Sequence, residues 1–264
     1  MVADVLAILD LGSADAGFVA QAVQFASTRN AHLTIAVSVL VNSFEASLAK
    51  AGGYPIADNL RASVRAKKDA LIAQFAHIAI LCYEGDTTEI VKILAARTSI
   101  SDLALFGPPS GYGDTYFRRR ALEHLALCSG RPVLIVPPSG VADRFEHIVL
   151  GWNGTREASR ALNDALPLLE RNARVDVVAV SPADAPIALE PLCEHLRRSE
   201  FVVEPHLLTG TDPTGDQLLR FVEQRQAQLL AIGAFAHSRF EEIMLGGVTR
   251  DLIEDASVPI LFSH

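Results

Sequence analysis

The chain has 264 residues, of which half are hydrophobic and a fifth are charged, and its formal net charge is -8 at pH 7. This length and composition predict one large or two ordinary globular domains and exclude a disordered chain. The excess of acidic residues argues against general binding to nucleic acids or anionic membranes, because both attract a basic surface.

The cysteines and the N-terminus indicate the cellular compartment. Cys82, Cys128 and Cys193 are far apart, and no C-x-x-C pair occurs. This pattern favours a reducing compartment over a disulfide framework or a zinc site. Residues 1–10 lack a basic leader and are interpreted as a buried strand, not a signal peptide. No uncharged run reaches the roughly 18 residues of a membrane span, so we expect a soluble, cytoplasmic protein.

The first half alternates short apolar runs with segments of helical periodicity. Runs rich in Val, Ile and Leu that close on glycine or polar turns predict buried strands, and apolar residues three and four apart predict helices. Asp86 or Thr87 is the expected N-cap of one of these helices. We predict strands at 5–9, 33–41, 78–83, 103–106 and 132–136, and helices at 18–26, 59–76, 87–97 and 117–128.

The Pro-Pro-Ser-Gly segment at residues 137–140 predicts a domain boundary, after which the alternation restarts. In the second half we predict strands at 147–151, 175–180, 201–208, 229–232 and 258–262, and helices at 157–169, 185–198, 216–226 and 248–255. The chain is therefore divided into an N-terminal domain at 1–138 and a C-terminal domain at 143–264.

Matched segments indicate an internal duplication. The correspondences are 102–107 with 228–233, 131–136 with 258–262, and 10–13 with 153–155. Each half then has five buried strands joined by helical crossovers. This predicts an α/β fold of two tandem open five-stranded parallel sheets with helices on both faces. Ligands of such sheets bind beyond the carboxyl ends of the strands, where Asn153 and Gly233 both fall.

Residues 229–250 have the layout of a phosphate site, in which a strand is followed by a glycine loop and a helix start. Backbone N–H groups of a helix's first turn attract phosphate oxygens. Glycines also permit tight strand-to-helix turns, so a simple turn is the other interpretation. His237 and Arg239 either contact the ligand or stay in solvent.

These residues resemble the universal stress protein family, in a tandem form with two family domains in one chain. The resemblance is clearest at 148–158, 233–239, 245–250 and 258–261. It implies the strand order 3-2-1-4-5 of the adenine nucleotide α-hydrolase-like fold in each half. It also implies pairing of the two domains through their last strands, as an internal pseudo-dimer, and leaves a homodimer open.

Nucleotide-binding members of this family carry Gly, two residues, Gly, nine residues, and then Gly followed by Ser or Thr. These positions fall here on Gly233, Ala236, Gly246 and Gly247, so the second and the fourth depart from the pattern. The methyl group of Ala236 costs about 1 kcal/mol if its position needs a positive φ. The hydroxyl that Gly247 lacks is available nearby on Thr249.

Two further family positions complete the predicted site. The acidic residue after the first strand is replaced by Asn153, which keeps an acceptor oxygen and loses the charge. Val180 falls at the hydrophobic neighbour of adenine. In the first half, residues 107–121 lack a glycine pair before their helix, and two prolines remove backbone donors. We expect that half to have lost the family's nucleotide site.

The resemblance implies a stress-response module that binds an adenine nucleotide, ATP with Mg²⁺, in its C-terminal domain. Two alternatives stay open: a nucleotide-independent scaffold for other proteins, and slow ATP hydrolysis with a metal ion as Lewis acid. No catalytic residue and no metal site are assigned. The predicted nucleotide contacts are Asn153, Val180, Gly233, Ala236, His237, Gly246, Gly247, Val248 and Thr249.

Other candidate groups each have an ordinary structural interpretation. The triplet Arg118-Arg119-Arg120 forms either an anion site or a solvated helix start. Cys193 and His195 are interpreted as a helix surface, not as metal ligands. Trp152 either covers a base or packs under the rim of the crevice.

Overall fold

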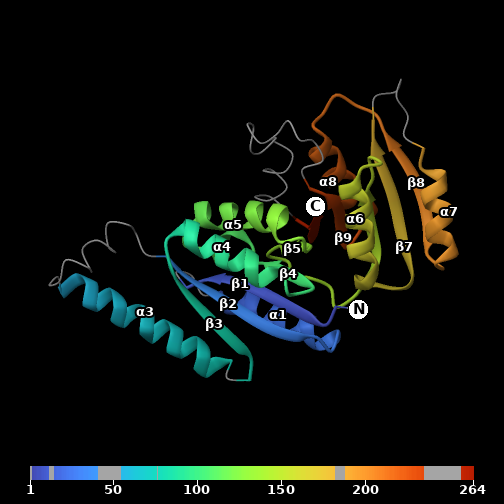
Figure 1. Cartoon of the computed structure of the whole chain (residues 1–264). Helices are drawn as coiled ribbons and strands as arrows, with labels where there is room; N and C mark the ends of the chain where they lie inside the picture. The colour runs from blue at the N-terminus through green and yellow to red at the C-terminus, as the bar shows by residue number, and fades with distance from the viewer. Residues whose placement is uncertain (1, 12–14, 41–54, 76, 182–187, 235–256) are drawn as a thin grey trace.

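The structure is a computed structural model that describes residues 2–11, 15–40, 55–75, 77–181, 188–234 and 257–264 (Figure 1). The first half alternates strands and helices as predicted. Its elements are β1 (Asp4–Asp10), α1 (Ala16–Thr28), β2 (His32–Leu40), α3 (Pro55–Gln74), β3 (Ala79–Gly85), α4 (Thr87–Thr98), β4 (Leu103–Phe106), α5 (Thr115–Cys128) and β5 (Val133–Ile135).

The second half repeats this alternation. Its elements are β6 (Phe145–Gly151), α6 (Arg156–Ala165), β7 (Leu169–Val180), α7 (Glu190–Arg198), β8 (Val202–Leu208), α8 (Thr214–Arg225), β9 (Leu229–Gly233) and β10 (Ile260–Ser263). The helix predicted at 248–255 lies outside the described residues.

Polar side chains fix the starts of several helices. The carboxylate of Asp15 accepts hydrogen bonds from the first turn of α1, and Asp86 Oδ1 accepts from Glu89 N at 2.9 Å at the start of α4. Asp114 and Thr155 cap α5 and α6 in the same way. These bonds satisfy backbone donors that a helix leaves free at its N-terminus.

Prolines lie near two helix boundaries that differ from the prediction. The helix predicted at 157–169 ends at Ala165, and a 3-10 turn at Leu166–Leu168 leads directly into β7. Pro167 in that turn has no N–H group to continue an α-helix. Of the helix predicted at 185–198, residues 185–187 lie outside the described residues and residues 188–189 are not helical. The described helix begins at Glu190, with Pro191 in its first turn, a position that proline tolerates.

The five strands of each half are parallel and have the expected order. The complete order is β3-β2-β1-β4-β5-β10-β9-β6-β7-β8, so each half has the order 3-2-1-4-5. The two predicted sheets are in fact one ten-stranded sheet, because β5 and β10 pair antiparallel. The pairs Ile135–Ile260, Leu134–Leu261 and Val133–Phe262 join the halves, which confirms pairing through the last strands.

Helices cover both faces of this sheet and enclose two cores. One core contains residues of α1, α3, α6 and α7, and the other contains residues of α4, α5 and α8. Side chains of β1 alternate between the cores: Leu6 and Ile8 face one, and Ala7 and Leu9 face the other. Central strands buried on both faces account for the continuous apolar runs in the sequence.

Candidate functional site

The carboxyl ends of β6, β7 and β9 meet at one edge of the second half. β6 lies between β7 and β9, and all three are parallel. The strand order reverses at the β6–β9 pair, because consecutive strands run outward from it in opposite directions. Asn153 follows β6, Val180 ends β7 and Gly233 ends β9, so the structure brings these predicted site residues to one edge.

Gly233 is at a place where no side chain fits. A Cβ atom there would lie 2.5 Å from the carbonyl carbon of Glu157 and 2.6 Å from Ala158 N, both in the backbone of α6. The first turn of α6 therefore rests directly on the end of β9. The chain beyond Gly233 is held by Ala234 N, which donates to Ser263 O at 2.7 Å.

A tight turn connects β6 to α6 at the same edge. Asn153 Oδ1 accepts from Thr155 Oγ1 at 2.7 Å and from Thr155 N at 3.2 Å, and Gly154 has φ of +74°. Thr155 in turn accepts from Ala158 N and caps α6. Asn153 is exposed, so its side chain faces solvent beside the start of α6.

Glu157 adds a negative charge to this first turn. Its pKa is lowered because its own backbone N–H donates to the carboxylate, and the neighbouring Arg156 guanidinium adds to this effect against the opposing effect of burial. Arg156 Nη2 lies 3.0 Å from Glu157 Oε1. A carboxylate in the first turn also suits the positive end of the helix dipole.

Trp152 and Val180 are both half-buried and pack against opposite cores. Trp152 packs against the core that contains α6 and α7, and Val180 packs against the core that contains α8. Trp152 N donates to Val178 O at 2.8 Å, which holds it beside β7. Packing under the rim therefore describes Trp152, and Val180 is a partly exposed apolar residue at the edge.

The other predicted site residues cannot be placed. Ala236, His237, Gly246, Gly247, Val248 and Thr249 all lie outside the described residues. Arg239 lies outside them as well.

The corresponding edge of the first half is filled by the chain itself. Asp10, at the end of β1, is 4% exposed, and its Oδ2 accepts from Gly113 N at 2.8 Å and Asp114 N at 3.2 Å. Tyr112 is buried, and its hydroxyl donates to Ile8 O at 2.6 Å. The segment between β4 and α5 thus folds back over the end of β1.

Arg118 is buried, which corrects the interpretation of this residue as part of a solvated helix start. It is 2% exposed, and its Nε and Nη2 donate to Gly107 O at 3.1 and 3.0 Å. Its guanidinium lies 5.5 Å from the centre of the Tyr112 ring. Arg118 therefore holds the closed segment in place, while Arg119 and Arg120 pair with Glu123.

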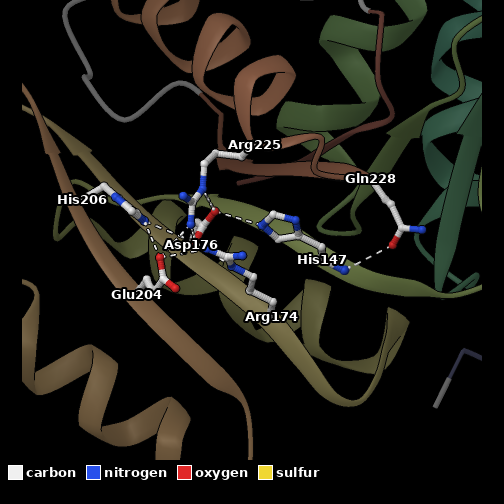
Figure 2. Close-up of polar contacts among 7 residues, drawn as sticks. All are labelled: His147, Arg174, Asp176, Glu204, His206, Arg225 and Gln228. Atoms are coloured by element: carbon white, nitrogen blue, oxygen red, sulfur yellow. Dashed lines mark hydrogen bonds and ion pairs between the residues drawn. The ribbon is translucent and has the colours of Figure 1, made fainter.

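A polar cluster lies in the second half, away from the edge where Asn153, Val180 and Gly233 meet, and it was not predicted from the sequence. Figure 2 shows His147, Arg174, Glu204, His206 and Arg225 converging on Asp176. Asp176 is fully buried in β7, within the apolar run Val175-Asp176-Val177-Val178. An acidic residue within an apolar strand sequence could have indicated this cluster, because a buried charge needs compensating partners.

The Cys193–His195 pair does not form a shared site. Cys193 is buried in the core on α7, whereas His195 is exposed. Burial raises the pKa of the Cys193 thiol. His195 therefore lies on the helix surface as expected, whereas Cys193 packs in the core, which corrects the interpretation of that residue.

The fold and the site define a class of protein: an α/β protein of two fused five-stranded units with a ligand edge at a strand-order reversal. Residues 144–264 match the model of the Universal stress protein family. The second half of the chain thus matches this family, and the first half repeats its strand order. Comparison with curated proteins gave no match.

Solved structures resemble the chain over both halves. A universal stress protein from Archaeoglobus fulgidus is 17% identical, with 98% of this chain and 95% of that chain covered at a TM-score of 0.65. A putative universal stress protein from Pseudomonas aeruginosa is 14% identical, with 99% and 93% covered at 0.55. A functionally unknown protein from the same species is 13% identical, with 99% and 92% covered at 0.55. These likenesses show a shared fold.

The described residues contain no helix that is both long and apolar enough to cross a membrane.

Proposed function

We propose that the C-terminal domain binds an adenine nucleotide at the edge formed by β6, β7 and β9, and that the protein acts as a stress-response binding module. Asn153 would contact the ribose or the adenine amine, and Val180 would contact the adenine ring. The predicted loop residues Gly246, Gly247 and Val248 would donate backbone N–H groups to the phosphates, with Mg²⁺ accompanying ATP.

One observation carries this proposal: the tight packing at Gly233. Backbone atoms of α6 occupy the space where a side chain would lie, so the end of β9 and the first turn of α6 form one surface at the strand-order reversal. This is where open α/β sheets bind ligands. The exposed Asn153 and the half-buried Val180 flank that surface.

The contacts in the first half support different roles for the two halves. Its Asp10 carboxylate is engaged by Gly113 and Asp114, and Tyr112 covers the end of β1. We therefore assign the N-terminal domain, residues 1–138, a structural role and expect one nucleotide for each chain, in the domain at 143–264.

Calorimetric titration of the full chain with ATP, ADP and AMP tests the proposal. Binding of one equivalent with a Kd below ~1 mM is expected, and Asn153→Ala should weaken it roughly tenfold or less, since one hydrogen bond is removed. Asn163→Ala is the matched control, because Asn163 is an exposed asparagine on α6 whose Nδ2 donates to Ser159 O. No saturable binding, or binding unaffected by Gly246→Val, would contradict the proposal.

Slow ATP hydrolysis at the same edge is the enzymatic alternative. Asn153 replaces the family's acidic residue, and the nearest described carboxylate on α6, Glu157, is paired with Arg156. We therefore rank hydrolysis below binding. Phosphate release with Mg²⁺ or Mn²⁺ that disappears in Asn153→Ala would reverse this order.

A nucleotide-independent scaffold is the third function. The closed first half and the departures at Ala236 and Gly247 favour it. A purified chain that carries no nucleotide by mass spectrometry, and that retains a protein partner without added ATP, would replace the nucleotide proposal with this one.

A further inference from the structure

The polar cluster around Asp176 brings together side chains from four elements of the second half. His147 belongs to β6, Asp176 to β7, His206 to β8 and Arg225 to the last turn of α8. Asp176 is fully buried, whereas His206 and Arg225 are 22% and 28% exposed at their side chains. The cluster is therefore anchored inside the protein and partly exposed to solvent at His206 and Arg225.

Asp176 is the centre of the contacts. Its Oδ2 lies 2.9 Å from His147 Nε2 and accepts from Arg225 Nε at 2.8 Å. Its Oδ1 lies 3.2 Å from His206 Nε2 and accepts from Arg225 Nη2, also at 3.2 Å. Both imidazoles thus present Nε2 to the same carboxylate, from opposite sides in Figure 2.

The donor atoms suit a divalent transition metal ion. Asp176, Glu204 and His206 each offer one ligand atom, and these atoms lie within 4.8 Å of one another. His206 Nε2 lies 3.2 Å from Asp176 Oδ1 and 3.7 Å from Glu204 Oε2. A tetrahedral ion with ligands at ~2.0–2.2 Å places its donor atoms about 3.3–3.6 Å apart, so little movement is needed. Imidazole and carboxylate together favour zinc-like ions over Mg²⁺.

Arg225 already supplies a positive charge at this place. Its Nη2 bridges the two carboxylates, at 2.7 Å from Glu204 Oε2 and 3.2 Å from Asp176 Oδ1. Arg174 Nη2 donates to Glu204 Oε2 at 2.9 Å from the other side. An ion bound by both carboxylates must displace the Arg225 guanidinium, whose partly exposed side chain can turn towards solvent.

We propose that the Asp176 cluster binds a Zn²⁺-like divalent ion through Asp176, Glu204 and His206, in exchange for Arg225. His147 is the fourth candidate ligand. Each imidazole then carries its proton on Nδ1 and offers the Nε2 lone pair to the metal. Because Arg225 belongs to the last turn of α8, ion binding breaks the ion pairs that tie this turn to β7 and β8, whereas Val222 of the same turn stays in the core.

This site is separate from the proposed nucleotide edge. His147 is near the amino end of β6, whereas Asn153 follows its carboxyl end. The inference does not depend on nucleotide binding, and either one can fail alone.

Titration of metal-free full chain with Zn²⁺, and with Co²⁺ as a spectroscopic probe, tests the proposal. One ion should bind to each chain, with the absorption of tetrahedral or five-coordinate Co²⁺. His206→Ala and Glu204→Gln should weaken binding at least tenfold. His195→Ala and Glu194→Gln are the matched controls, since both residues are exposed on α7, away from the cluster. These controls should leave the affinity unchanged.

Arg225→Gln provides the decisive variant, because it removes one of the two guanidinium groups that pair with both carboxylates, leaves Arg174 in place and keeps a polar side chain. It should bind Zn²⁺ at least tenfold more tightly than the natural chain. Hydrogen exchange of α8 in the natural chain should speed up when Zn²⁺ is added. Three results would overturn the proposal: no saturable binding by the natural chain, equal affinity in Arg225→Gln, or full affinity in His206→Ala. Circular dichroism and thermal unfolding show that each variant is folded before its affinity is compared.

Discussion

Tyr112 covers the carboxyl end of β1 in the first half. Its ring is buried against Phe106, with the ring centres 6.3 Å apart, and its hydroxyl reaches the backbone of β1 at Ile8 O. The phenol supplies both apolar area and a hydrogen-bond donor at the end of a central strand. Burial raises the pKa of Tyr112 well above its usual value, so ionisation and folding oppose each other.

Tyr112→Phe should destabilise the chain by about 1–3 kcal/mol at pH 8, because a buried acceptor loses its donor. A tyrosine with a raised folded-state pKa stabilises fully below its unfolded pKa of about 10, and loses this contribution as pH rises above it. The difference between the natural chain and Tyr112→Phe should therefore shrink at about pH 11. Urea unfolding at both pH values measures it. Tyr116→Phe, at a tyrosine that is 55% exposed, should change neither value, and a constant difference would contradict the argument.

Gly233→Ala tests the packing of the proposed ligand edge at the same scale. Gly233→Ala places a methyl group against the backbone of Glu157 and Ala158, so β9 and α6 must separate. We expect a loss of about 1–3 kcal/mol, as for other overpacked sites, read from the midpoint of denaturant unfolding. Gly210→Ala is the control, because its Cβ would meet only the flexible Gln217 side chain at 3.4 Å or more. Equal midpoints for the two variants would show that the edge can relax.

At the scale of elements, the same tie joins the first and fourth strands of both halves. Asp102 Oδ2 accepts from Ala3 N at 2.7 Å and Asp4 N at 3.1 Å, which holds the start of β1 beside β4. Gln228 Oε1 accepts from Glu146 N at 2.7 Å and His147 N at 3.2 Å, which holds β6 beside β9. The duplicated strands therefore share a side-chain clamp that is charged in one half and neutral in the other.

This difference gives the two clamps different pH responses. Partial burial raises the pKa of Asp102, but the hydrogen bonds from Ala3 and Asp4 and the charge of Arg131 outweigh it, so the pKa is lowered. A carboxylate whose pKa is lowered by folding stabilises the folded state fully above its unfolded-state pKa. This stabilisation is lost as the pH falls through its folded-state pKa. Asp102→Ala should cost ~1 kcal/mol at pH 7 and less at about pH 3. Gln228→Ala should lower the free energy of unfolding by the same amount at pH 7 and at about pH 3, because its amide carries no charge. If the losses in Asp102→Ala and Gln228→Ala depend on pH in the same way, the charge of Asp102 does not contribute to its clamp.

Regular elements could be predicted from the sequence, whereas most contacts between elements could not. The apolar run at 103–106 and the cap at Asp86 mark their structures locally, so strand β4 and the start of α4 follow directly. The helix predicted at 157–169 ends at Ala165, because the apolar periodicity continues past Pro167, which has no N–H group for an α-helix. The strand order and the joint between the halves came from the family resemblance.

The candidate sites show the same limit. Asn153, Val180 and Gly233 each follow or end a strand, so their common edge could be predicted. The closure by Tyr112 depends on a hydrogen bond to a residue 104 positions away. The Asp176 cluster assembles side chains from four elements, which no local pattern contains.

At the scale of the whole molecule, the β5–β10 pair makes the two halves dependent on each other. The paired residues Val133, Leu134, Leu261 and Phe262 are all at most 3% exposed. Separation of the halves would expose both these side chains and two rows of unpaired backbone groups. Arg160 Nη2, which donates to Gly130 O at 2.9 Å, adds a further contact between the halves.

A fragment of residues 143–264 should therefore form a dimer through β10 at micromolar concentration. An apolar edge strand without its partner is a template for pairing with a second copy. Sedimentation over a concentration series measures the association. Addition of a 1–138 fragment should convert the dimer into a one-to-one complex that restores the β5–β10 pair. A folded 143–264 monomer at all concentrations would contradict this expectation.

The joint between β5 and β10 also sets how many copies the architecture can hold. Each half has a single last strand, and the two last strands pair with each other. No last strand is left to join a third copy of the domain in the same way. A third copy would have to attach at β3 or β8, the outer strands of the described sheet. β8 carries Pro205, Glu204 and His206, and proline and charge both hinder edge pairing. Antiparallel pairing further directs the carboxyl edges of the two halves to opposite sides, so the filled crevice and the proposed ligand edge face away from each other. A partner protein that recognises the bound ligand would thus approach the molecule from the side of the carboxyl edge of the second half.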